Sequence, residues 1–182
     1  MGVLDIIACL FGVLGVVFTI KQNILCWPIA IVGLLASFYA FYIQRLFGDA
    51  FLQLIYLIYS FYGWIYWNKH KQTDFSITFS PKKQLIFLGL ITILLFIGIY
   101  SLLKYFKGDK ILIDALLTSL SLTTTYMMIK KWIENWVLWV IIDVTYVFLY
   151  LSKAMYIFSL LYFIYALVAF WGFLEWKKIL KK

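Results

Sequence analysis

The chain of 182 residues is short of charge, cysteine, histidine and proline, and these shortages exclude several classes of protein. Charged residues make up 13% of the chain, whereas a soluble domain carries about 25%. The two cysteines, Cys9 and Cys26, show no CxxC spacing, which excludes a disulfide framework or zinc site and predicts small core residues. The single histidine, His70, lies among lysines without acidic or thiol neighbours. We therefore expect a solvent-exposed His70, no metal, no cofactor and no enzymatic activity.

Hydrophobic residues, in contrast, make up 65% of the chain, and they are arranged in long runs. A helix needs about 20 apolar residues to cross a bilayer, so seven runs of this length leave no room for a soluble domain. The sequence predicts an all-α polytopic protein whose partner is the lipid bilayer. The seven expected helices cover about residues 4–20, 24–44, 49–67, 85–106, 112–129, 132–151 and 156–176.

The net charge of +8 comes from lysines that gather beside the expected helices, which is typical of juxtamembrane anchors and excludes nucleic acid as the favoured partner. If the expected helices cross the membrane in turn, five of the 16 basic residues lie on the same side of the membrane as the N-terminus and eleven lie on the opposite side. The positive-inside rule then predicts a multi-pass protein of the cell (inner) membrane, with the N-terminus outside and the C-terminus cytoplasmic. The main clusters are Lys69/Lys71/Lys82/Lys83, Lys104/Lys107/Lys110 and Lys177/Lys178/Lys181/Lys182.

The chain also repeats itself at a nearly constant shift. The matches are Asp5 to Lys21 with Asp114 to Lys130 at a shift of 109, Asn23-x-x-x-Trp27 with Asn135-x-x-x-Trp139 at 112, and Gly63-x-x-x-Trp67 with Gly172-x-x-x-Trp176 at 109. They predict a three-helix repeat at 1–69, a cytoplasmic loop and linker helix at 70–108, and a second repeat with a basic tail at 109–182. An intervening helix makes the repeats parallel, as in sugar transporters of the SWEET type, with a substrate site near the midplane between them.

Asp143 is the clearest candidate for function, because a charge at the bilayer centre costs about 2.5–3.5 kcal/mol. It belongs to one helical face with aromatic residues on both sides, which suits a flat cationic ring. The alternative is a helix–helix hydrogen bond for Asp143 and an interfacial belt for the tryptophans; we accept the belt for Trp132 and favour function for Asp143 and Trp139. The face reads Trp132, Trp136, Trp139, Asp143, Tyr146, Tyr150.

Two other spans carry polar residues with less specific patterns. In the third, Gln53 and Tyr56 could bind a ligand or join helices, while Asp49 suits a helix N-terminus. Asp5 and Asp114 suit helix N-termini in the same way. In the fifth, the hydroxyls of Ser119, Ser121, Thr123, Thr124 and Thr125 favour close packing over a polar cavity. The matching face of the seventh span reads Phe158, Tyr162, Tyr165, Ala169, Gly172, Trp176.

Trp136-x-x-Trp139-x-x-x-Asp143 resembles the W-x-x-W-x-x-x-N/D signature of the Pnu family of vitamin-precursor transporters. Further agreement lies in Trp27-Pro28, Gly48-Asp49-x-x-x-Gln53, Gly63-Trp64 and Gly172-x-x-x-Trp176, so that the resemblance covers nearly the whole chain. It implies a three-plus-one-plus-three helix arrangement, a central substrate and facilitated diffusion without ATP. It also implies a functional link to a separate cytoplasmic kinase that traps the vitamin.

We expect nicotinamide riboside as the cargo, with thiamine as the alternative, because family members for thiamine often carry Asp at position 143. Its ring would stack between Trp136 and Trp139, Asp143 would meet its charge, and Gln53, Tyr56 and Thr124 would contact its polar groups. An intramembrane aspartyl protease is disfavoured, since Leu46 and Ile142 break the motifs of that class. A purely structural membrane protein remains an alternative, and the sequence is compatible with a homo-oligomer.

Overall fold

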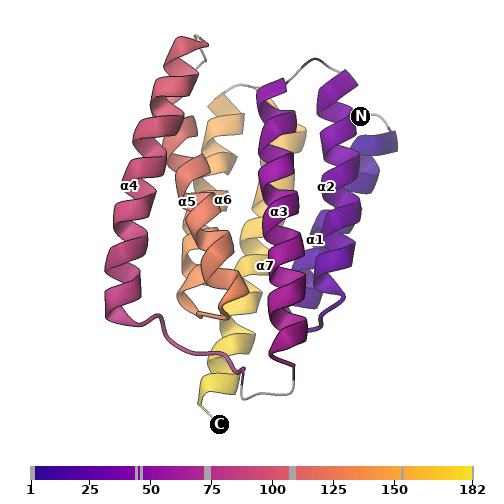
Figure 1. The fold of residues 1–182 in the computed structure, drawn as a ribbon. Coiled ribbons are helices and arrows are strands. Elements are labelled where there is room, and N and C mark those ends of the chain that lie inside the picture. The colour runs from indigo at the N-terminus through magenta and orange to yellow at the C-terminus, as the bar shows by residue number, and fades with distance from the viewer. Residues whose placement is uncertain are drawn as a thin grey trace. The chain divides into compact units, whose positions relative to one another are not determined.

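The structure is a computed structural model that describes residues 3–43, 45, 47–71, 75–106, 110–152 and 154–181, without the side chains at 5, 47 and 48. Lys107, Lys153, Lys182 and the side chain of Asp5, which the sequence expectations invoke, lie outside the described residues. Over the described ranges the chain forms seven helices (Figure 1). They are α1 Val3–Ile20, α2 Cys26–Ile43, α3 Phe47–Lys69, α4 Lys82–Tyr105, α5 Ile111–Ile129, α6 Glu134–Ser152 and α7 Tyr156–Leu180.

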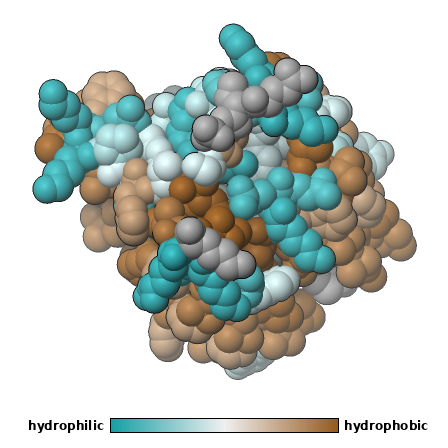
Figure 2. Space-filling model, turned by 90° about the horizontal axis from the view of Figure 1, so that it is seen from below, coloured by the Kyte–Doolittle hydropathy of each residue, from teal (hydrophilic) through white to brown (hydrophobic). Residues whose placement is uncertain are grey.

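The helix expectations are confirmed, including the turn at Lys130 and Lys131 that separates α5 from α6. By length and composition, five of the described helices could cross a membrane: α2, α4, α5, α6 and α7. The apolar stretch Ile6–Ile20 of α1 is shorter, and α3 carries Asp49, Gln53 and Asn68 along its length. Figure 2 looks at the helix ends from below and shows hydrophilic residues gathered there with hydrophobic residues around them.

The chain divides into two compact units. In the first, Met1–Ser76, α2 packs against both α1 and α3. In the second, Ile77–Lys182, α4 packs on α5, α5 on α6 and α6 on α7 (Figure 1). The helix that the sequence marks as a linker, α4, is thus part of the second unit. It is held there by Leu88, which packs with Met127 and Trp132, and by a hydrogen bond of 3.2 Å from the hydroxyl of Thr92 to that of Thr123.

The turns that end α1 and α5 have the same backbone geometry. Gln22 and Lys131, which are 109 positions apart, both adopt a positive φ, 52° and 56°. In each turn the following N–H donates to a carbonyl five residues back, as in a Schellman motif: Asn23 to Phe18 at 2.9 Å and Trp132 to Met127 at 3.0 Å. The turns after α2 and α6 match at the same shift, with Arg45 at φ 59° and Ala154 at φ 56°.

The same shift relates two clusters of tryptophan and glycine, one in each unit, which we call the indole clasps. In the first, Trp27 meets Trp67 edge to face at 5.3 Å and 89°. In the second, Trp136 meets Trp176 at 5.3 Å and 90°. The equivalent of Trp27 is therefore Trp136, and the sequence alignment of Trp27 with Trp139 at a shift of 112 is wrong. The error arose because Trp136 and Trp139 lie on the same helical face.

Each clasp closes over a glycine whose missing side chain makes room for the indole. A Cβ on Gly63 would lie 2.5 Å from Cζ2 of Trp27, and a Cβ on Gly172 would lie 2.7 Å from Cε3 of Trp136. Real Cβ atoms do not approach other atoms this closely, so neither ring could stay in place. Glycine at these two positions is a packing requirement of the α2–α3 and α6–α7 contacts.

Gly63→Ala and Gly172→Ala should each lower the thermal unfolding midpoint of the detergent-purified protein. Overpacking a core costs about 1–3 kcal/mol, which exceeds the gain of about 1 kcal/mol from replacing a helical glycine by alanine. The matched controls are Gly89→Ala and Gly98→Ala in α4, where an added Cβ would meet nothing within 4 Å. These controls should keep or raise the midpoint. A rise in Gly63→Ala and Gly172→Ala would show that the indole rings do not need the space that the glycines leave.

Candidate functional site

The aromatic faces that the sequence identifies in the sixth and seventh spans pack against each other. Their ring pairs run along the whole α6–α7 contact: Tyr150 on Phe158 at 5.5 Å, Tyr146 on Tyr162 at 4.6 Å, and Trp136 on Trp176 at 5.3 Å. Three of the six residues of the face that the sequence identifies, namely Trp136, Tyr146 and Tyr150, therefore pack against α7. Ring stacking of this kind stabilises the helix pair by about 0.5–1.5 kcal/mol per contact.

Trp139 and Asp143 belong to the same face but do not take part in these ring pairs. Trp139 is half-buried and packs against a cluster of α5 and α6 formed by Leu117, Ile142 and Leu149. Asp143 lies in the middle of α6 with only 5% of its surface exposed. Within the described part of the chain, no group donates a hydrogen bond to its carboxylate and no cation pairs with it. A buried acid without a partner is costly, which is typical of a residue retained for function.

The hydroxyl-rich stretch of α5 divides into packing residues and one exception. Ser119, Thr123 and Thr125 donate to carbonyls of their own helix at 2.8–3.1 Å, which supports the packing interpretation. Thr124 is fully buried, and its hydroxyl has no hydrogen-bond partner among the described residues. Because an unsatisfied buried polar group costs about 1–3 kcal/mol, the Thr124 hydroxyl is a candidate to bind something that is absent from the structure.

Two further unsatisfied polar atoms lie at the start of α6. Trp136 is 1% exposed, and its indole N–H has no partner among the described residues. Asn135 is also fully buried; its amide nitrogen donates to the carbonyl of Trp132 at 2.6 Å, but its side-chain oxygen is unpartnered. Sequence reasoning used Asn135 only as a repeat marker. An amide beside two tryptophans at the start of an apolar helix was the signal that could have identified it.

The unsatisfied polar atoms are concentrated in the second unit. At the shift of 109, Thr124 and Asn135 are replaced in the first unit by Gly15 and Cys26, neither of which has a polar side-chain oxygen. Among the described residues of the first unit, Trp27 repeats the pattern, with an unpartnered indole N–H. The two contacting helices α5 and α6 thus carry four of the six residues that the sequence assigns to the site, namely Thr124, Trp136, Trp139 and Asp143.

The remaining two site residues, Gln53 and Tyr56, lie on α3 in the first unit, and both are half-buried. Asp49 lies in the first turn of α3 and is exposed, which agrees with a helix N-terminal position. Asp114 lies in the first turn of α5, which agrees with the same expectation. Among the described residues, no group of three His, Cys, Asp or Glu could hold a metal ion.

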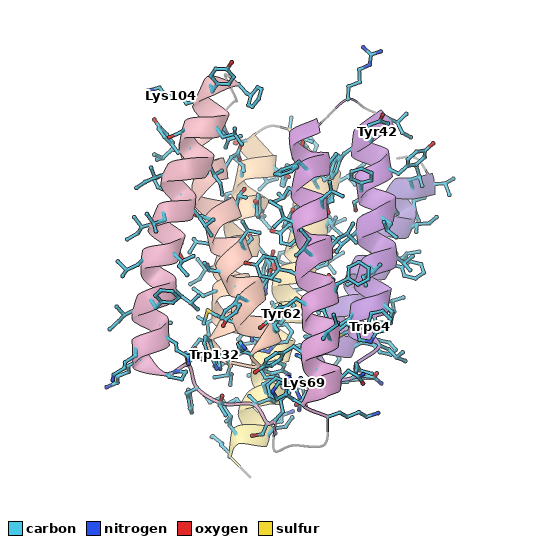
Figure 3. All side chains as sticks on the ribbon, in the orientation of Figure 1. Tyr42, Tyr62, Trp64, Lys69, Lys104 and Trp132 are labelled. Atoms are coloured by element: carbon cyan, nitrogen blue, oxygen red, sulfur yellow. The ribbon has the colours of Figure 1, made fainter. Side chains whose placement is uncertain are left out.

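Three expectations about single residues have clear outcomes. Cys9 is half-buried and Cys26 is buried, as expected of core residues. His70 is not in open solvent: its ring lies 4.2 Å from that of Tyr66 and is half-buried. Trp132 is not an interfacial anchor either, because it is buried against Leu88 and Met127 at the end of α5 (Figure 3).

Comparison with known proteins shows the family. The family model described as nicotinamide mononucleotide transporter matches residues 2–178. The chain belongs to this family. As a member of the nicotinamide mononucleotide transporter family it is a multi-pass membrane protein of a group of vitamin transporters. Transporters are not enzymes, so the expectation of no enzymatic activity is confirmed at the level of the family, and the protease alternative loses its support.

Proteins similar to this chain are named as transporters of different vitamins. The riboflavin/roseoflavin transporter RibM of Streptomyces davaonensis is 22% identical, with 94% of this chain and 83% of RibM covered. The nicotinamide riboside transporter PnuC of Haemophilus influenzae is 25% identical (98% and 81% covered), and that of Escherichia coli is 23% identical (75% and 69% covered). A crystal structure of the vitamin B3 transporter PnuC shares the fold, with a TM-score of 0.78, 21% identity, and 98% of this chain and 82% of that chain covered.

Asp143→Asn should leave the thermal unfolding midpoint unchanged or raise it, because the substitution replaces a buried ionisable group by a neutral amide of similar size and breaks no described contact. Thr123→Val is the matched comparison, since it removes the hydroxyl contact to Thr92 and should cost about 1 kcal/mol. Both midpoints would be measured on detergent-purified protein. A loss for Asp143→Asn as large as that for Thr123→Val would identify Asp143 as a structural contact between helices.

Proposed function

We propose that this protein carries a small aromatic vitamin precursor across the membrane by facilitated diffusion, with nicotinamide riboside as the first candidate and thiamine as the second. The observation that carries the proposal is the partnerless carboxylate of Asp143 beside Trp139, in a chain of a vitamin transporter family. Both candidates are cations with an aromatic ring. RibM is named as a riboflavin transporter. Riboflavin is uncharged, so it would not form an ion pair with a buried carboxylate.

In the proposed complex, the ligand ring stacks on Trp139, and Asp143 neutralises its positive charge. The Thr124 hydroxyl donates a hydrogen bond to a polar substituent of the ligand or accepts one from it, and the Asn135 side-chain oxygen accepts one, which satisfies atoms that lack partners in the structure. Trp136 is enclosed by Gly172 and Trp176, so stacking on its second face requires movement of α7. Gln53 and Tyr56 are proposed to contact polar groups of the ligand, and their spacing along α3 is the only support for this role.

The proposed architecture is two parallel three-helix repeats, α1–α3 and α5–α7, joined by α4. It is supported by the positive-φ turns and the indole clasps, which recur at a single shift of 109. In transporters built from such repeats, alternating access comes from rocking one repeat against the other. The lysine distribution supports an N-terminus outside and a cytoplasmic C-terminus. A cytoplasmic kinase that traps the vitamin completes the proposed route, since facilitated diffusion cannot accumulate a cargo.

The experiment is a thermal unfolding series of the purified protein with nicotinamide riboside, thiamine and riboflavin. A ligand at about 100 times its Kd stabilises the folded state by about 2.7 kcal/mol, so the true cargo raises the midpoint. We expect a rise with nicotinamide riboside or thiamine and none with riboflavin. Nicotinamide, which lacks the ribose and the positive charge, is the control ligand.

The control variants separate the site from the fold. Asp143→Leu should keep its unfolding midpoint and lose the rise. Thr145→Val lies on the same helix, where the Thr145 hydroxyl bonds only to the carbonyl of Ile141 among the described residues, and it should keep the rise. A protein that none of the three vitamins stabilises would overturn the proposed cargo and leave the family assignment intact, whereas a rise retained in Asp143→Leu would overturn the proposed site.

A further inference from the structure

The segment that precedes α4 is bonded to the turn between α5 and α6. Thr78 uses both of its backbone groups there: its N–H donates to Lys131 at 3.2 Å, and its carbonyl accepts from Ile133 at 3.0 Å. Thr78 and Trp132 form a parallel bridge, and Ile77 beside it is buried. The segment is thus joined by a single β-bridge to a turn that has a helix on either side.

Glu134, the first residue of α6, fixes the next part of this segment. Its two carboxylate oxygens accept from the backbone N–H of Ser80 at 3.0 and 3.1 Å, and one of them also accepts from the Ser80 hydroxyl at 2.8 Å. Charge-assisted bonds of this kind are about twice as strong as neutral ones. Pro81 follows as the N-cap residue of α4, so residues 77–81 pass directly from this anchor into the helix.

Phe75, two residues before Ile77, is anchored in the first unit instead. Its ring packs against three rings at the end of α3: Tyr66 at 5.3 Å, His70 at 5.5 Å and Trp67 at 6.4 Å. Trp67 belongs to the first indole clasp, so Phe75 is joined to the core of that unit. Only Ser76, which is exposed, separates the two anchors, and the division between the units falls directly after it.

Within the part of the chain that the structure describes, no segment is bonded in this way to the equivalent turn of the first unit. Gln22 and Ile24, at a shift of 109 from Lys131 and Ile133, have no bond to a distant segment among the described residues. The Asn23 side chain instead accepts from the N–H of Leu25 at 2.9 Å and satisfies the start of α2 locally. The attachment is therefore specific to the second unit.

We propose that Phe75–Ser80 is a short strap that couples the two units, with Phe75 as its anchor in the first, Ile77–Ser80 with Glu134 as its anchor in the second, and Ser76 as the pivot. One residue between two anchors restricts how far and in which directions the units separate. The strap rests on contacts within each unit and not on the identity of the cargo. In the proposed rocking motion, backbone rotation is concentrated at Ser76.

The test compares two insertions of Gly-Ser-Gly in the same connection. One is placed between Ser76 and Ile77, inside the anchors, and the other after Thr73, outside them. Three residues add up to about 10 Å of reach. Spin labels on cysteines at the exposed positions Lys21 and Lys177, in a background with Cys9 and Cys26 replaced by alanine, report the distance distribution between the units.

The insertion inside the anchors should broaden this distribution by several ångströms, while the insertion outside them should leave it as in the parent. An unchanged distribution in both variants, or equal broadening in both, would overturn the strap. No transported substrate is needed, so failure of the strap and failure of the proposed cargo are separate results.

Glu134→Ala gives a second measurement that changes no chain length. Hydrogen exchange of the Thr78 and Ser80 amides should become faster in this variant, because the Ser80 N–H loses its acceptor. Glu175→Ala, which removes an acid from a surface pair with Lys178 in α7, is the matched control and should leave both amides as protected as in the parent. Equal protection of the two amides in the parent and in Glu134→Ala would show that Glu134 does not hold the strap.

Discussion

An indole ring lying directly over a glycine fixes how closely the last two helices of each half approach one another. Trp27 over Gly63 and Trp136 over Gly172 set the α2–α3 and α6–α7 contacts, and the edge-on partners Trp67 and Trp176 hold the rings in place. Other features follow from this contact. Phe75 packs on Trp67, and the residues next to Trp136 include both Asn135 and the strap anchor Glu134.

Buried polar side-chain oxygens without partners accompany this packing in the second half, among the described residues. Where the first half has Gly15 and Cys26, the second has Thr124 and Asn135, each with a buried oxygen that the described residues do not satisfy. Asp143 adds a carboxylate in the same pair of helices, at a position where the first half has Leu34. A bilayer offers no water to compensate such groups, so their concentration in α5 and α6 is the feature that a purely structural role does not explain.

The sequence predicted the helices well because each is a long apolar run, and hydrophobicity over about 20 residues is a strong signal. It also predicted that the faces of the sixth and seventh spans are aromatic, and these faces do pack together. The sequence matched Trp27 with Trp139 instead of Trp136, because Trp136 and Trp139 lie on one helical face. The contact of Trp136 with Gly172 distinguishes the two tryptophans. The burial of Trp132 and the pairing of Thr78 could not be predicted, since both depend on a segment without periodicity.

The constant separation of 109 positions has a consequence for the side chains that these turns accept. The turns after α1 and α2 match those after α5 and α6 residue for residue, although most of the side chains differ. The spacing of these turns is therefore the same in both units, although their side chains differ. The geometry of these helix ends therefore does not depend on one particular set of side chains, so a residue beside such a turn can be exchanged while the helices on either side keep their positions along the chain.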